Sequence, residues 1–140
     1  MPRFKLHISR SLLDAVIAHA RAETPNECCG LLAGMIENGE GRVARHFPLV
    51  NELFSPTEYL SESGSMIAAE KGRRTAGLEV LAIYHSHPAS EPIPSKTDLA
   101  RNYWGETVMH VIVGLAGIQA SIRGWWLGET DFQEAEIVVT

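Results

Sequence analysis

The stretch YHSHPASEPIPSKTD, residues 84–98, joins the end of a strand, a proline-rich turn and the start of a helix. It follows the apolar run 78–84, which is long enough for one buried strand. Residues two apart in a strand point to the same side, so His85 and His87 can converge on one point. The prolines that follow stop the strand and bend the chain into a loop. That loop can return Asp98 toward both histidines.

Two imidazoles and one carboxylate form the ligand set of an open zinc site, which leaves a fourth position for water. Each part also has a plainer interpretation. A His-x-His pair often occurs by chance, and Ser95-x-x-Asp98 is also a capping box that starts a helix. The combination is more specific, because a buried strand ends in the histidines and the helical turn directs the aspartate back. It predicts a hydrolytic centre with Zn²⁺ as cofactor.

A hydrolytic centre also needs a carboxylate that is not a ligand, which takes a proton from water and passes it to the leaving amine. Glu27 stands at the beginning of a small-residue strand, residues 28–36, and is the best placed candidate. Glu91 is the alternative, but it lies in the proline-rich loop, which would hold a base less firmly.

Apolar periodicity and turn residues predict the other elements outward from this stretch. We expect strands over 4–8, 28–36, 42–50, 78–84, 107–115, 118–127 and 132–139, a helix from Ser9 or Ser11 to Thr24, and helices over 63–76 and 96–104. This order predicts a single α+β domain over residues 1–140, with a mixed, largely antiparallel, curved sheet flanked by helices.

Composition excludes several classes of protein. The chain has 140 residues, a net charge of −5 and no basic run, which argues against nucleic acid as a partner. Its two cysteines, Cys28 and Cys29, are adjacent and do not support a disulfide framework, which suits a reducing cytosol. Residues 1–10 lack an apolar signal core, and no run approaches 18 apolar residues. We therefore expect a cytoplasmic protein with no membrane partner.

Some side chains are assigned no chemical role. His19 is expected on the solvated side of its helix, and His46 is expected to be a partly exposed strand residue. The oligomeric state stays open, with a homodimer among the alternatives. Trp104, Trp125 and Trp126 are candidates for such an interface or for the core.

Taken together, Glu27, the His85-x-His87-Pro block and Ser95-x-x-Asp98, with seven residues between the second histidine and the serine, resemble the JAMM motif of the MPN (JAB-type) metallopeptidases. The run that starts at Glu27 also resembles the first strand of that family. The resemblance spans essentially the whole chain. It implies that His85, His87 and Asp98 bind Zn²⁺, that Glu27 is the general acid/base, and that Ser95 hydrogen-bonds the oxyanion.

The resemblance further implies a protease that cleaves peptide or isopeptide bonds after the Gly-Gly tail of ubiquitin or ubiquitin-like proteins. The short chain is similar to stand-alone prokaryotic forms, some of which process ubiquitin-like sulfur-carrier proteins. A loop that contains Ser55, Thr57 and Tyr59 resembles a segment of that subgroup, and we expect it to line the groove for an extended glycine tail.

Two alternatives remain. A RadC-like, DNA-repair-associated JAB domain carries a similar histidine block, but the acidic net charge counts against it. A non-catalytic MPN scaffold for protein interactions is the other, and the intact motif counts against it. A zinc deaminase would need His-x-Glu and Pro-Cys-x-x-Cys, and neither is present.

Overall fold

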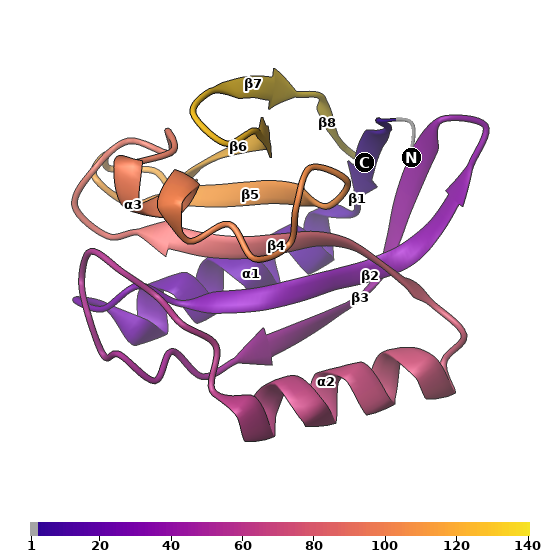
Figure 1. Ribbon diagram of the computed structural model, residues 1–140, viewed down its shortest axis with the longest axis horizontal. Coiled ribbons are helices and arrows are strands. Elements are labelled where there is room, and N and C mark those ends of the chain that lie inside the picture. The colour runs from indigo at the N-terminus through magenta and orange to yellow at the C-terminus, as the bar shows by residue number, and fades with distance from the viewer. Residues whose placement is uncertain (1–2) are drawn as a thin grey trace.

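The structure is a computed structural model that describes residues 3–140, and its strands curve around the middle of the molecule (Figure 1). The elements in chain order are β1 (Lys5–Ile8), α1 (Arg10–Glu23), β2 (Cys29–Glu37), β3 (Glu40–Leu49), α2 (Ser63–Thr75), β4 (Glu79–His87), α3 (Lys96–Ala100), β5 (Met109–Gly114), β6 (Ser121–Leu127), β7 (Phe132–Ala135) and β8 (Ile137–Val139).

All eight strands belong to one sheet, in the order β7-β6-β5-β4-β2-β3-β1-β8. Four pairings are antiparallel, and the pairs β1–β3, β1–β8 and β4–β5 are parallel. The two outermost strands, β7 and β8, are separated only by Glu136, so the sheet is nearly closed. The predicted α+β fold with a mixed, curved sheet is confirmed.

The helices α1 and α2 cover opposite faces of the sheet. Leu32 and Tyr84 pack in one apolar cluster with the α1 residue Val16, whereas Leu31 and Ile83 pack in another cluster on the α2 side. Adjacent residues of a strand point to opposite faces, so the two clusters lie on the two sides of β2 and β4. His85 and His87 have the parity of Ile83 and therefore face the side of α2.

Strand β4 is central, as predicted, and it continues through His87 rather than ending at Tyr84. From Leu81 onward every residue of the strand is buried. The ring of Tyr84 lies directly over Gly30 of β2, where an added Cβ would be only 2.2 Å from the ring. A glycine at this position lets the tyrosine lie flat across the neighbouring strand.

Several boundaries differ from the expectations. The side chain of Ser9, not Ser11, caps α1 by accepting a hydrogen bond from the amide of Leu12. Helix α3 ends at Ala100, four residues before the predicted end, because Asn102 uses its side chain to bind loop backbone groups instead of continuing the helix. The predicted last strand is two strands, which pair with β6 and β1 respectively.

The expectation for His19 was wrong. Its side chain is only 13% exposed, and Nδ1 hydrogen-bonds the hydroxyl of Tyr84 at 2.7 Å. His46 is partly exposed, as expected. Trp125 and Trp126 are buried, so they belong to the core rather than to an exposed surface. None of the helices within residues 3–140 is long and apolar enough to span a membrane.

Candidate metal centre

Three buried side chains meet at the carboxyl end of β4. His85 Nε2 lies 3.2 Å from His87 Nε2 and 3.3 Å from Asp98 Oδ1, and His87 Nε2 lies 3.1 Å from Asp98 Oδ2. Across residues 3–140, this is the one group of three or more His, Cys, Asp or Glu side chains close enough to share a metal ion. The strand period and the turn of α3 thus bring together the three predicted ligands.

The donor set fits a zinc ion. Zinc binds histidine nitrogen and carboxylate oxygen at about 2.0–2.2 Å, so neighbouring ligand atoms of a tetrahedral site lie roughly 3.3 Å apart. His87 Nδ1 hydrogen-bonds the carbonyl of Glu91 at 2.8 Å, and because a carbonyl only accepts, Nδ1 carries the hydrogen. Nε2 of the neutral ring then presents a lone pair to His85 and to the carboxylate. These atoms repel one another unless a cation lies among them.

The electrostatics of the cluster agree with this conclusion. Burial alone would lower the pKa of His87, but the hydrogen bonds that its protonated ring makes with Asp98 and the Glu91 carbonyl outweigh burial and raise it. Burial alone would raise the pKa of Asp98, but its contacts with both histidines hold that pKa well below its usual range. The cluster therefore favours a bound positive charge, and a metal ion would compete with a proton for this place.

A reciprocal capping box holds Asp98 in position. Ser95 Oγ accepts a hydrogen bond from the amide of Asp98 at 3.1 Å, and the amide of Ser95 donates to Asp98 Oδ2 at 2.9 Å. The plainer interpretation of this motif is therefore correct, and it coexists with the cluster. Ser95 is exposed, and because its oxygen accepts in the cap, its hydroxyl hydrogen remains free to donate.

Glu27 lies just before β2, and Cys29, two residues later, pairs with His85 across the sheet. Its side chain is 3% exposed, and Oε1 has no hydrogen-bond partner among residues 3–140. Burial raises the pKa of Glu27 to about 8; the charge of His87 opposes this shift, and that of Asp98 adds to it. Glu91, the alternative base, is exposed and contributes its carbonyl instead.

The loop between β3 and α2 holds Glu27 from two sides. The amide of Glu27 donates to the carbonyl of Ser55 at 2.8 Å, and Asn51 Nδ2 donates to the carbonyl of Glu27 at 3.0 Å. The buried Asn51 also donates to the carbonyl of Glu58, and its Oδ1 accepts from Leu53 and Leu60. All four hydrogen-bonding positions of this amide are used, so it fixes the shape of the loop.

The three predicted groove residues have different surroundings. Tyr59 stacks on His85, with ring centroids 4.6 Å apart and an interplanar angle of 25°. Ser55 is half-buried, and its Oγ accepts from the amide of Thr57 at 3.2 Å. Thr57 is exposed. Tyr59 therefore supports a candidate ligand from one side, while the other two shape the loop beside Glu27.

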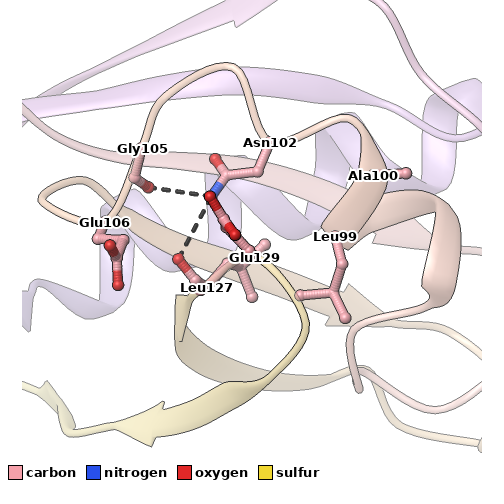
Figure 2. A pocket seen from close by; sticks show the side chains of 8 residues that line it. Leu99, Ala100, Asn102, Gly105, Glu106, Leu127 and Glu129 are labelled. Atoms are coloured by element: carbon pink, nitrogen blue, oxygen red, sulfur yellow. Dashed lines mark hydrogen bonds between the residues drawn. The ribbon is translucent and has the colours of Figure 1, made fainter.

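The segment after α3 is anchored by Asn102, whose side-chain amide points between the carbonyls of Gly105 and Leu127 (Figure 2). Its Oδ1 accepts from the buried His110 at 3.0 Å. Burial lowers the pKa of His110 to about 3, so this imidazole is neutral. The cavity in Figure 2 has a volume of about 440 Å³, and Asp98 is not part of its lining. Asn102 thus anchors the chain directly after α3, the helix that carries the candidate ligand Asp98.

Sequence reasoning missed the residues that hold the site. The sequence pattern assigns no role to Asn51 and places Asn102 inside the predicted helix 96–104. Ser86 was not singled out, although its Oγ accepts from the amide of Cys28 at 2.8 Å and so ties β4 to the start of β2. Asparagine favours turns, and this preference is the signal that could have indicated the first two. Nothing in the sequence pattern pointed to the serine.

Comparison with known proteins places these features in context. Residues 9–128 match the family described as prokaryotic homologs of the JAB domain. A CysO-cysteine peptidase from Mycobacterium tuberculosis is 41% identical over 96 residues, which cover 69% of this chain and 64% of that protein. A probable TtuB-protein conjugate cleaving protease from Thermus thermophilus is 40% identical over 116 residues, which cover 82% and 74%.

The fold has a similar solved structure. A solution structure of a protein from Desulfitobacterium hafniense matches with a TM-score of 0.88 at 28% identity, covering 96% of this chain and 92% of that one. The chain spans slightly less than two thirds of the length of the mycobacterial peptidase.

Proposed function

Because the chain belongs to the family of prokaryotic JAB domains, we propose that it is a zinc-dependent metallopeptidase. Its proposed substrate is a ubiquitin-like sulfur-carrier protein, cleaved after the Gly-Gly tail. The observation that carries the proposal is the convergence of His85, His87 and Asp98 beside the buried carboxyl of Glu27. The names of two relatives, a CysO-cysteine peptidase and a probable TtuB-protein conjugate cleaving protease, support a peptidase that acts on a conjugate.

The three cluster residues would hold the metal through His85 Nε2, His87 Nε2 and a carboxylate oxygen of Asp98. Bound zinc supplies an activated water whose pKa is about 7 and polarises the scissile carbonyl. The Glu91 carbonyl keeps the His87 ring in the tautomer whose Nε2 lone pair faces the cluster. These residues thus prepare the site without taking part in proton transfer.

Glu27 is the proposed general acid/base. Its carboxyl accepts a proton from the attacking water and delivers it to the nitrogen of the leaving amine as the carbon–nitrogen bond breaks. A pKa of about 8 lies close to neutral pH, where a carboxyl can both take up and release a proton. Its backbone bonds with Ser55 and Asn51 hold it in place, which supports this assignment over the exposed Glu91.

Ser95 is the proposed donor to the oxyanion. Ser95 is the N-cap of α3 and is exposed. Its hydroxyl oxygen accepts the capping hydrogen bond, which leaves the hydroxyl hydrogen free to donate. Donation of the free hydroxyl hydrogen would stabilise negative charge on the scissile carbonyl oxygen in the transition state. The same residue would then orient the ligand Asp98 and stabilise the reaction.

Ser55, Thr57 and Tyr59 belong to the proposal as the wall of a substrate groove. An extended glycine tail can bind through its main chain, since it has no side chains that would clash with the wall. We also propose a cytoplasmic location, a homodimer, and no nucleic-acid or membrane partner. The free, buried cysteines and the acidic net charge support the location and the lack of nucleic acid.

The decisive experiment separates proton transfer from metal binding. Wild type and Glu27→Gln are loaded with zinc and incubated with a ubiquitin-like sulfur carrier that has a residue attached after Gly-Gly. Cleavage is read by intact mass, and zinc content is measured on the same samples. We expect Glu27→Gln to keep its zinc and to lose at least 100-fold in rate, the lower range for a general base. Glu91→Gln is the matched control and should stay active.

Full activity of Glu27→Gln together with loss in Glu91→Gln would move the base to the loop. If zinc-loaded wild type cleaves no Gly-Gly substrate but still binds the carrier, the non-catalytic scaffold becomes the better interpretation.

A further inference from the structure

Two segments approach each other beside the candidate metal ligands. One is the end of the loop before α2, and the other is α3 with the residue that follows it. Tyr59 of the first segment and Thr97, Asp98 and Arg101 of the second line a cavity of about 10 Å³. A cavity of this size holds about one water molecule. The approach to Asp98 between these segments is therefore narrow in the free protein.

An ion pair joins the same two segments. Arg101 Nη2 lies 3.7 Å from Glu58 Oε2, and the two side chains are 38% and 39% exposed. An exposed pair with one long contact contributes only about 0–1 kcal/mol. This bridge can therefore open at little cost in free energy. The carbonyl of Glu58 is bound by Asn51, so its backbone stays fixed when the side chain moves.

Other residues of the same loop and of the chain after α3 line a larger hollow. Its volume is about 390 Å³, and its lining includes Ser61 of the loop, Tyr103 and Trp104 after α3, and Met66 of α2. An extended chain that binds beside Asp98 can run between the two segments, where Tyr59 and Arg101 line the narrow cavity. Such a chain passes Arg101 on one wall and the Glu58 loop on the other.

A glycine tail offers a binding site only its main-chain amides and carbonyls. A carboxylate accepts a hydrogen bond from an amide, and a guanidinium donates to a carbonyl. We propose that Glu58 and Arg101 form a clamp that opens, grips the main chain of the residues before the scissile bond, and restricts those residues to glycine. The proposal rests on the proposed function above. Because the free protein leaves room for only about one water here, the segments must separate to admit any chain, and a glycine main chain requires the least separation.

The test measures binding and selectivity separately. Arg101→Ala and Glu58→Ala are each made in wild type and in Glu27→Gln, which is used as an inactive background for titration calorimetry with a Gly-Gly-extended carrier. We expect each substitution to weaken binding about tenfold, as for a lost hydrogen bond to a charged group, and to leave kcat within about twofold. Arg123→Ala removes another exposed ion pair, with Glu134, and serves as the matched control without effect.

Selectivity is read with carriers in which either glycine is replaced by alanine. Wild type should prefer the Gly-Gly carrier over both, and the clamp variants should lose at least half of that preference. A charge exchange, Glu58→Arg with Arg101→Glu, restores the ion pair but places donor and acceptor on the wrong walls. Because the scissile bond fixes the register of the tail, binding should remain weak in this double variant.

Two results would overturn the clamp while leaving the proposed function intact. In both, zinc-loaded wild type cleaves the Gly-Gly carrier. In the first, the single variants bind and discriminate as wild type does. In the second, the charge exchange restores wild-type binding, as a purely structural ion pair would. No cleavage by zinc-loaded wild type would instead refute the proposed function, and the clamp with it.

Discussion

The ring of Tyr59 stacks on the imidazole of His85, with centroids 4.6 Å apart. The loop that was expected to receive substrate thus also supports one of the candidate ligands. His85 Nδ1 has no hydrogen-bond partner among residues 3–140, so the stacked ring adds a restraint that this nitrogen does not provide. Tyr59 therefore has a role before any substrate arrives.

Loss of the stacked ring should weaken metal binding. We expect Tyr59→Ala to lower zinc affinity about 10- to 100-fold, the range for losing a partner that orients a ligand. Tyr59→Phe keeps the ring and should bind zinc as wild type does. Competition with a chromophoric chelator measures both affinities. Unchanged zinc affinity in Tyr59→Ala, combined with a raised KM, would confine this residue to the substrate groove.

The ligand set can be tested by stoichiometry. The purified protein should bind about one zinc per chain, and His87→Ala should bind less than a tenth of that. Added zinc should raise the melting temperature of wild type but not of His87→Ala, because only a protein that binds the ion gains stability from it. His19→Ala, on the opposite face of the sheet, is the matched control. Stoichiometric metal in His87→Ala would refute the ligand set.

Glu27 should make the metal-free protein less stable as pH rises. Its pKa is about 8 in the folded state and near 4.5 when exposed, so the folded state retains a proton that the unfolded state has lost. Stability therefore falls between about pH 4.5 and pH 8 and levels off above that. Glu27→Gln lacks this loss and should be more stable by a few kcal/mol at pH 8, since one pKa unit corresponds to about 1.4 kcal/mol.

Urea unfolding in the presence of a chelator, from pH 5 to pH 9, measures this difference. Glu52→Gln removes an exposed carboxyl from the neighbouring loop and should follow the wild-type curve. Parallel curves for wild type and Glu27→Gln would show that the buried carboxyl does not retain its proton.

A methyl group at Gly30 should disturb the site from the opposite face of the sheet. The added Cβ would lie 2.2 Å from the ring of Tyr84, so the ring or the strand must move. We expect Gly30→Ala to lower the free energy of unfolding by about 1–3 kcal/mol, as for an overpacked core, and to weaken zinc binding through the adjacent His85. Gly117→Ala adds its methyl group where the nearest atom is 3.5 Å away and should change stability by less than about 0.5 kcal/mol.

The local parts of the site could be predicted from the sequence. His85 and His87 share a face because strands have a period of two, and the capping box fixes how Asp98 leaves the first turn of α3. These relationships involve residues close together in the chain. The position of Glu27 does not follow from such local relationships. It depends on the register of β2 against β4, which pairs Cys29 with His85.

The rest depends on contacts between distant segments. His19 was predicted to be solvated, but its surroundings include Tyr84, whose flat position requires Gly30 on a third element. The hydrophobic periodicity of α1 does not indicate that Tyr84 and Gly30 lie beside His19. Similarly, Asn102, which follows α3, binds not only loop groups but also the carbonyl of Leu127, which belongs to β6. Such partners become visible only when the strand order is known.

The pairing of β1 with β8 has a consequence for the order of events during synthesis. It joins Leu6 to Ile137, so β1, which leaves the ribosome before β8, finds its outer partner only when β8 follows. Until then β1 has only β3 beside it, and its open edge can pair with other chains. Emergence of residues 137–139, rather than assembly of the metal cluster, sets the earliest moment at which the sheet can close.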